Sequence, residues 1–130
     1  MKKKIFLMCI IGLLSITSAY AKCDGGTEIT NTAGTTFCRS DVGLSNWWSA
    51  YAWCRANGRT LATMYEMCPS WDGNTGGGKC PELSGKGGGS AWSATAYGEH
   101  YTFIVDLSNG HVSNIYGRHG SGSTFPVICR

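Results

Sequence analysis

The sequence predicts an exported α+β domain held together by disulfide bonds, on three observations. The first 21 residues have the pattern of a secretory signal peptide. Six cysteines remain after them, an even number in a small chain. A predicted hairpin comes first, helices follow, and a glycine-rich loop and a run of strands close the chain. Helices and strands that are segregated along the sequence in this way are typical of α+β folds.

Residues 1–21 begin with a short basic segment, continue with the apolar run 5–14 and end in Ala19-Tyr20-Ala21. A basic start, a short apolar segment and small residues spaced for cleavage are the parts of a signal peptide. The apolar run is too short for a stable membrane anchor. We therefore expect cleavage after Ala21, no membrane span afterwards, and one secreted or periplasmic domain over residues 22–130.

The composition of residues 22–130 limits the classes of partner. Three of the 11 Lys and Arg leave with the predicted signal peptide, so 8 remain against 8 Asp and Glu. A neutral domain has no electrostatic basis for binding nucleic acid or acidic lipid. Cys9 leaves as well, and the other six cysteines indicate three disulfides. None has the Cys-x-x-Cys spacing of zinc sites, so we expect no metal and no cofactor.

Two short β-forming runs, 27–30 and 35–39, surround the turn sequence Asn31-Thr32-Ala33-Gly34. Two such runs on either side of a turn predict an N-terminal β-hairpin. Cys23 and Cys38 flank it.

The stretch from Asn46 to Pro69 predicts two helices. Asn46 is a favourable N-cap, and apolar residues recur at helical spacing from Trp47 to Cys54. Asn57-Gly58 supplies a left-handed stop. Thr63-x-x-Glu66 is a capping box for a second, short helix that Pro69 ends.

Residues 70–90 contain eight glycines and predict a long loop. Long loops inside compact domains are usually functional or disordered. Cys68 and Cys80 are spaced to tie down its first half, which favours an ordered loop. Trp71, Asp72 and Asn74 begin it and combine a flat apolar ring with hydrogen-bonding groups, a combination that suits sugar rings or a protein surface.

The last third of the chain predicts antiparallel strands, at 91–95, 100–107, 111–116 and 124–129. Apolar and polar residues alternate along 100–107, with His100, Thr102 and Asp106 on the polar face. Asn109-Gly110 predicts a two-residue type I′ turn. Pro126 indicates that the last strand lies at an edge or enters its sheet late.

The helical stretch also resembles a known family. Its pattern is Trp47-x-x-Ala50-x-x-x-Cys54-x-x-x-Gly58-x-x-Leu61-Ala62-Thr63-x-x-Glu66. This looks like the main helix of C-type lectin-like domains. The later motifs look most like a bacterial branch that includes the C-terminal domains of collagen-like adhesins and similar exported proteins: Trp92-Ser93-x-Thr95, the strand before Asn109-Gly110, and Val127-Ile128-Cys129-Arg130. The likeness covers most of residues 46–130 as an order of motifs.

The resemblance implies a disulfide between the helix cysteine, Cys54, and the last-strand cysteine, Cys129. It also implies that the hairpin with Cys23 and Cys38 is similar to the one in long-form members. Of the fifteen connectivities that six cysteines allow, we therefore predict Cys23–Cys38, Cys54–Cys129 and Cys68–Cys80.

The sugar-binding members of that family carry Glu-Pro-Asn or Gln-Pro-Asp in the long loop and Trp-Asn-Asp on a following strand. This chain has neither motif, so we expect no calcium-dependent sugar site. The resemblance then implies an adhesin- or lectin-like binding module, not an enzyme, that recognises an extracellular glycan or protein surface through its long loop. The identity of the ligand and the oligomeric state stay open.

Seven residues are candidates for contact with this ligand: Trp71, Asp72, Asn74, Tyr97, His100, Arg118 and His119. Trp71 is expected to face solvent, because the surrounding glycines cannot cover it. Trp47, Trp53 and Trp92 are expected in the core, because they lie at motif positions or on apolar periodicity.

Two other classes of function are consistent with the sequence. The chain could be a structural or accessory subunit of a surface appendage. It could also be a histidine-dependent enzyme, because a two-residue Asn109-Gly110 turn would place His100 opposite His119 across the hairpin. A histidine pair would still need a third convergent group to act as a metal site or a general base.

Overall fold

A computed structural model describes residues 23–74, 78–117 and 122–130. The predicted signal peptide and its cleavage point lie outside the described residues. Within these ranges, no helix is long and apolar enough to cross a membrane.

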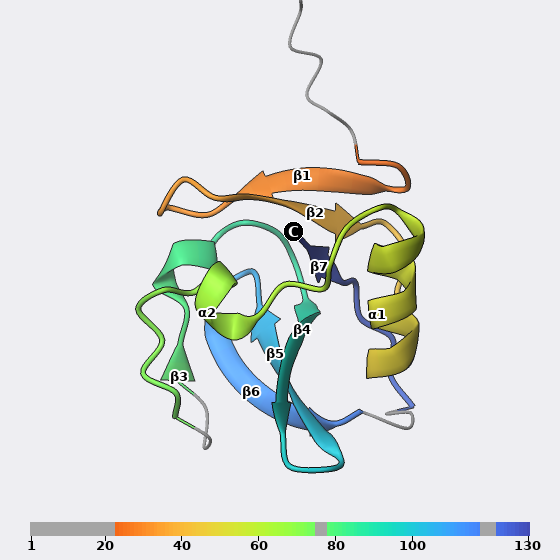
Figure 1. The fold of residues 1–130 in the computed structure, drawn as a ribbon. Coiled ribbons are helices and arrows are strands. Elements are labelled where there is room, and N and C mark those ends of the chain that lie inside the picture. The colour runs from red at the N-terminus through yellow and green to blue at the C-terminus, as the bar shows by residue number, and fades with distance from the viewer. Residues whose placement is uncertain (1–22, 75–77, 118–121) are drawn as a thin grey trace, which may run out of the picture.

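The fold is α+β, with two antiparallel sheets of three and four strands. Their strand orders are β1-β2-β7 and β3-β6-β5-β4. Figure 1 shows the β1–β2 hairpin across one end, the longer sheet below it, and the two α-helices on opposite sides. In chain order the elements are β1 (Gly26–Thr30), β2 (Thr36–Ser40), α1 (Trp47–Ala56), α2 (Met64–Met67), β3 (Gly78–Lys79), the 3-10 helix η1 (Pro81–Leu83), β4 (Ser90–Tyr97), β5 (Tyr101–Asp106), β6 (His111–Tyr116) and β7 (Ile128–Cys129).

Three disulfides hold these elements together, and all three match the predicted pairs. Cys23–Cys38 closes the N-terminal hairpin, Cys54–Cys129 joins α1 to β7, and Cys68–Cys80 closes the start of the glycine-rich segment. The first two lie side by side, because Cys38 of β2 is directly opposite Cys129 of β7. The hairpin, α1 and β7 therefore meet at one buried point.

Helix α1 begins and ends where its capping residues predict. The Asn46 side chain accepts a hydrogen bond from the backbone N–H of Ser49 at 2.8 Å. Gly58, just past the C-terminal end, has φ of 69°. Ala50 and Cys54 of the predicted apolar stripe are fully buried, but Tyr51 of the same stripe is 37% exposed. The buried face of α1 is narrower than the sequence pattern indicates.

Helix α2 is a single turn that its capping box stabilises. Thr63 Oγ1 accepts from the Glu66 N–H, and Glu66 Oε1 accepts from the Thr63 N–H, each at 3.1 Å. The other Glu66 oxygen accepts from the Arg130 guanidinium. Partial burial alone would raise the pKa of Glu66, but hydrogen bonds from Arg130 and Thr63 outweigh it and lower the pKa below its usual value. The carboxylate thus links α2 to the end of the chain.

The four-stranded sheet is buried on both faces in its middle. Phe103 and Val105 of β5 contribute to an apolar cluster with α2, whereas Ile104 between them contributes to a second cluster under α1. Thr102 lies on the face predicted to be polar and is nevertheless fully buried. Its hydroxyl donates to the Thr95 carbonyl at 3.0 Å, so the burial leaves no unpaired hydroxyl.

The connection between β5 and β6 differs from the prediction. Val105 pairs with Val112, so residues 107–110, not Asn109-Gly110 alone, connect the two strands. A type I′ turn needs positive φ at both central residues. Gly110 has φ of 74°, but no described non-glycine residue has a positive φ. The predicted two-residue turn, and the strand register that depended on it, are therefore wrong.

Hydrogen bonds from the glycine-rich segment explain this longer connection. The Lys86 N–H donates to the Leu107 carbonyl, and the Leu107 N–H donates to the Gly89 carbonyl, each at 2.9 Å. The Cys80 N–H donates to the Gly110 carbonyl at 2.6 Å. Leu107 itself is fully buried. The burial of Leu107 and these hydrogen bonds to a distant segment determine the length of the connection. The local Asn109-Gly110 signal carries no information about either.

Trp92 offers a test of the second core cluster. It is fully buried, and its indole N–H donates to the Leu44 carbonyl at 2.7 Å. We expect Trp92→Ala to lower the free energy of unfolding by about 4 kcal/mol, because it leaves a cavity and removes the hydrogen bond to Leu44. Trp48→Ala is the matched control, since Trp48 is 52% exposed, and should cost less than about 1 kcal/mol. Urea unfolding of both variants measures the difference, and equal losses would contradict this placement of Trp92.

The lowered pKa of Glu66 predicts pH-dependent stability. A carboxyl group whose pKa is lower in the folded state stabilises the fold above its unfolded pKa, and that contribution is lost as the pH falls through the folded value. Glu66→Gln keeps a side chain that can cap α2 but removes the charge. We expect the native chain to be more stable than this variant above about pH 5, and the difference to shrink below about pH 4. Urea unfolding across this range measures it, and a difference that grows towards low pH would contradict the assignment.

Candidate functional site

The structure places the predicted ligand-contact residues at two separate positions. Trp71, Asp72 and Asn74 begin the glycine-rich segment, whereas Tyr97 and His100 flank the β4–β5 turn. Both positions lie towards the lower end of the molecule in Figure 1. Arg118 and His119, the other two candidates, lie outside the described residues.

Trp71 is buried, which corrects the expectation that it faces solvent. Only 6% of it is exposed, and its ring packs 4.8 Å from Phe103 and 5.1 Å from Tyr65 between ring centroids. The Cys68–Cys80 disulfide folds the segment back, so that Trp71 extends the apolar cluster between α2 and the sheet. Its Nε1 is buried and has no hydrogen-bond partner in the described part of the chain. Trp71 is therefore a core residue. Glycines are its neighbours along the sequence, but aromatic rings are its neighbours in space.

Asp72 follows Trp71 and organises the local backbone. Its carboxylate accepts from the Asn74 N–H at 2.9 Å in an Asx turn. An open pocket of about 380 Å³ lies beside it, lined by Ser70, Asp72, Gly78, Lys79 and Pro81. Polar groups of both charges and one proline ring line this hollow, but no described aromatic face does. This region therefore lacks the stacking platform that Trp71 was expected to provide.

Three tyrosines form a continuous row across the other position. Tyr97 of β4 is opposite Tyr101 of β5, and Tyr101 is opposite Tyr116 of β6. The ring centroids are 6.2 Å and 5.6 Å apart along this row. The three side chains are 41–48% exposed, so each presents nearly half of its surface to solvent. We call Tyr97, Tyr101 and Tyr116 the tyrosine row.

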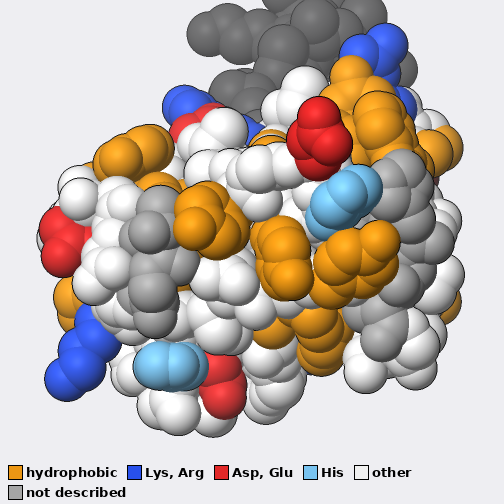
Figure 2. Space-filling model, turned by 90° about the horizontal axis from the view of Figure 1, so that it is seen from below, with side chains coloured by type: hydrophobic (Ala, Val, Ile, Leu, Met, Phe, Trp, Pro, Cys, Tyr) orange, Lys and Arg blue, Asp and Glu red, His pale blue; other side chains and the backbone are white. Residues whose placement is uncertain are grey.

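The tyrosine row continues a sheet face that is covered elsewhere. Side chains alternate along a strand, so Tyr101 shares its face with the buried Phe103. Tyr97 also contacts Phe103, with 6.0 Å between centroids, and Phe103 contacts Trp71. Helix α2 and Trp71 thus cover this face as far as Phe103, and beyond it the rings are open. Figure 2 shows hydrophobic side chains gathered at this end, with a histidine and an acidic side chain among them.

His100 and Glu99 lie in the turn beside the row. The His100 ring is 5.4 Å from that of Tyr116, and its Nε2 is 3.9 Å from a Glu99 carboxylate oxygen. The turn places both hydrogen-bond donors and hydrogen-bond acceptors next to three amphipathic rings. Aromatic rings with polar tips give large contact areas and lose little side-chain freedom on binding. This arrangement is suited to binding a ligand.

The sequence indicated two members of this site, Tyr97 and His100, but no pattern in it connected Tyr97 with Tyr101 and Tyr116. The missing information was the strand register. A three-residue turn that begins with Gly98, whose φ is 66°, places Tyr97 opposite Tyr101. That glycine was the available sequence signal, since a left-handed glycine between two apolar runs indicates a tight turn.

The strand register behind the predicted His100–His119 pair is wrong, and His119 itself lies outside the described residues. His100 accepts from the Gly117 N–H at 3.1 Å through its carbonyl, so residue 117, not 119, lies opposite it. Elsewhere, Ser108 donates from its hydroxyl to the Asp106 carboxylate at 2.6 Å. Hydrogen bonds from Ser108, helped by the nearby His111, lower the pKa of Asp106. The Ser108 N–H donates to the same carboxylate oxygen at 2.9 Å, so these two residues form an Asx turn.

One group of potential metal ligands occurs in the described part of the chain, consisting of Cys68, Cys80 and Glu82. The two sulfurs are bonded to each other, so the oxidised protein offers no thiolate there.

No protein-family model matches this chain, and no curated protein or solved structure matches it significantly.

The burial of Trp71 reverses the mutational behaviour expected of an exposed loop residue. We expect Trp71→Ala to lower the free energy of unfolding by about 3 kcal/mol or more, because it opens a cavity beside Phe103. Trp71→Phe keeps the aromatic contact and removes an N–H that has no partner, so it should cost less than about 1.5 kcal/mol. Thermal or urea unfolding separates the two variants. If both variants are as stable as the native chain, the result would contradict the burial of Trp71.

Proposed function

We propose that this chain is an exported binding module with a C-type lectin-like fold, and that it recognises an extracellular glycan or protein surface without calcium. The observation that carries the proposal is the tyrosine row. Three adjacent rings are substantially exposed at one end of a frame with three disulfides. Exposed apolar patches on an otherwise well-packed domain mark interaction sites.

The contacts made by the motif residues support the C-type lectin-like part of the proposal. Cys54 of α1 is bonded to Cys129 of β7, the pairing that the resemblance implies. Thr95, from the motif Trp92-Ser93-x-Thr95, accepts through its hydroxyl from the Met64 N–H at 2.8 Å. The motif residues thus join the helical stretch to the four-stranded sheet.

Export supports an extracellular ligand. Disulfides form and persist in oxidising compartments outside the cytoplasm. The pattern of residues 1–21 is that of a secretory signal peptide. A rigid exported frame suits recognition, since preorganised aromatic side chains lose little entropy when a ligand covers them.

Removal of a ring from the tyrosine row should weaken ligand binding more than it weakens the fold. Tyr101 is central, because it contacts both of the other rings. We expect Tyr101→Ala to weaken ligand binding by about 2 kcal/mol or more, roughly thirtyfold, as an interface anchor does. Its free energy of unfolding should change by less than about 1.5 kcal/mol, the scale of an exposed aromatic pair. The purified protein on arrays of glycans and of extracellular proteins supplies the ligand, and titration supplies the affinities.

Tyr51→Ala is the matched control, because Tyr51 is an exposed tyrosine on α1 outside the row. It should leave the affinity unchanged, and so should a calcium chelator. Binding that survives Tyr101→Ala but fails with chelator would contradict both the site and the calcium-independent mode. Self-association that every variant retains, with no ligand on either array, would favour the appendage-subunit hypothesis.

A further inference from the structure

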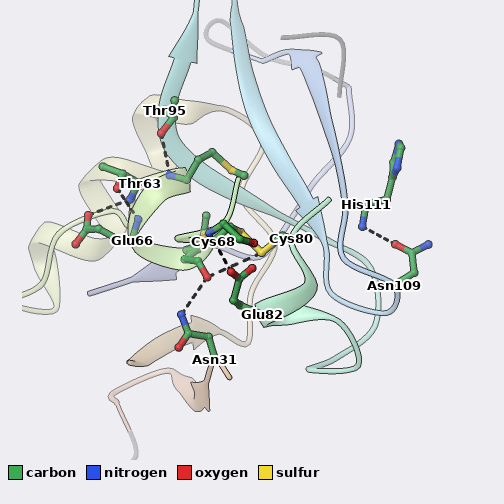
Figure 3. Close-up of a disulfide and its surroundings, with 12 residues drawn as sticks. Asn31, Thr63, Glu66, Cys68, Cys80, Glu82, Thr95, Asn109 and His111 are labelled. Carbon is green, nitrogen blue, oxygen red and sulfur yellow. Dashed lines mark hydrogen bonds between the residues drawn. A yellow bond between two sulfur atoms is a disulfide. The ribbon is translucent and has the colours of Figure 1, made fainter. Parts of the chain in front are cut away.

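The Cys68–Cys80 disulfide lies against a carboxylate. Both sulfurs and one oxygen of Glu82 lie within 4.8 Å of one another, and all three residues are buried. Figure 3 shows the Glu82 carboxylate beside the disulfide. The other two disulfides are not part of any such group in the described residues. This combination is specific to one of the three disulfides.

The Glu82 carboxylate has unused bonding capacity. Oε1 accepts from the Ser70 N–H at 3.0 Å, but Oε2 is buried and has no hydrogen-bond partner among the described residues. Glu82 as a whole is only 8% exposed. A buried polar atom without a partner is costly and calls for an explanation, such as a redox role or an ion.

The surrounding backbone holds Glu82 and the cysteines in place. The Thr32 N–H donates to the Glu82 carbonyl at 3.0 Å. The Asn31 side chain donates to the Met67 carbonyl, also at 3.0 Å, directly before Cys68. Asn31 is itself buried. The N-terminal hairpin therefore fixes both sides of the disulfide, and this arrangement does not depend on the sulfur–sulfur bond alone.

We propose that Cys68, Cys80 and Glu82 form a redox-controlled site for a thiophilic divalent cation such as Zn²⁺, which opens when the Cys68–Cys80 disulfide is reduced. Two thiolates and one carboxylate are a suitable zinc ligand set, and a tetrahedral ion takes one further ligand. The Met67 carbonyl, 3.9 Å from Cys80 Sγ, or a water molecule can supply it. Tetrahedral zinc needs its sulfurs roughly 3.8 Å apart, so they must separate after reduction.

The chemistry of the switch balances with a dithiol as reductant. Two electrons and two protons pass from the dithiol to the disulfide, which breaks into two thiols while the dithiol becomes a disulfide. The cation then displaces both thiol protons and binds the thiolates and the Glu82 oxygen. In reverse, a disulfide oxidant removes two electrons, the sulfur–sulfur bond re-forms and the cation is released. Either state closes residues 68–80 and holds Trp71 in the core.

Cobalt absorption tests the site in the purified protein under anaerobic conditions. After reduction with a phosphine, we expect one tightly bound equivalent of Co²⁺ with thiolate charge-transfer bands and the intense visible bands of a tetrahedral ion, displaced by Zn²⁺. The oxidised protein should bind none. Glu82→Gln should weaken the affinity at least tenfold, whereas Glu99→Gln, a change at a side chain that is 92% exposed, should leave it unchanged.

Alkylation mapping distinguishes this site from the other thiols that the phosphine releases. Zn²⁺ should protect Cys68 and Cys80 from iodoacetamide in the native chain, less in Glu82→Gln, and should not protect the other four cysteines. The double variant Cys68→Ser/Cys80→Ser should lose the tight equivalent. Equal affinity in the native chain, Glu82→Gln and the double variant would overturn the proposal. Equal protection of all six cysteines would overturn it too. Because the mapping is read at each cysteine separately, it detects this outcome even if reduction destabilises the fold.

Discussion

The fold depends on a two-residue strand, β7, that is paired on both sides and covalently bonded to a helix. Ile128 and Cys129 pair with β2 on one side, and Cys129 bridges to Leu61 on the other. The Ala62 N–H donates to the Ile128 carbonyl at 2.8 Å. Strands this short are marginal on hydrogen bonds alone. The bond from Cys129 to Cys54 closes a separation of 75 residues, which in the chain-entropy model stabilises the fold by about 4 kcal/mol.

The longer sheet is uncovered at one end, beside the β4–β5 turn. The hairpin, β7 and α1 close the upper part of the molecule in Figure 1, and α2 with Trp71 covers one sheet face as far as Phe103. Beyond Phe103 the strands continue into the β4–β5 turn, where nothing in the described chain packs over the tyrosine row. An aromatic surface that the core does not need is available for a partner.

Local signals in the sequence predicted most elements, because caps and turns depend on neighbouring residues. Asn46, the Thr63–Glu66 box and the N-terminal hairpin formed as expected. The errors occurred where distant segments decide the outcome. Hydrogen bonds with residues 80–89 replace the tight turn predicted at Asn109-Gly110. Trp71 is buried because the Cys68–Cys80 disulfide folds its segment back onto the core. The tyrosine row needed a strand register that no local pattern specifies.

The most direct test of the central claim is an NMR titration of tyrosine-labelled protein with the ligand found on the arrays. Five tyrosines remain after the predicted signal peptide: Tyr51, Tyr65, Tyr97, Tyr101 and Tyr116. If the tyrosine row is the contact surface, the ring signals of its three members shift together with a single saturation curve, while that of Tyr51 stays in place. A ligand that shifts Tyr51 or Tyr65 and leaves the three row signals unchanged would contradict the account.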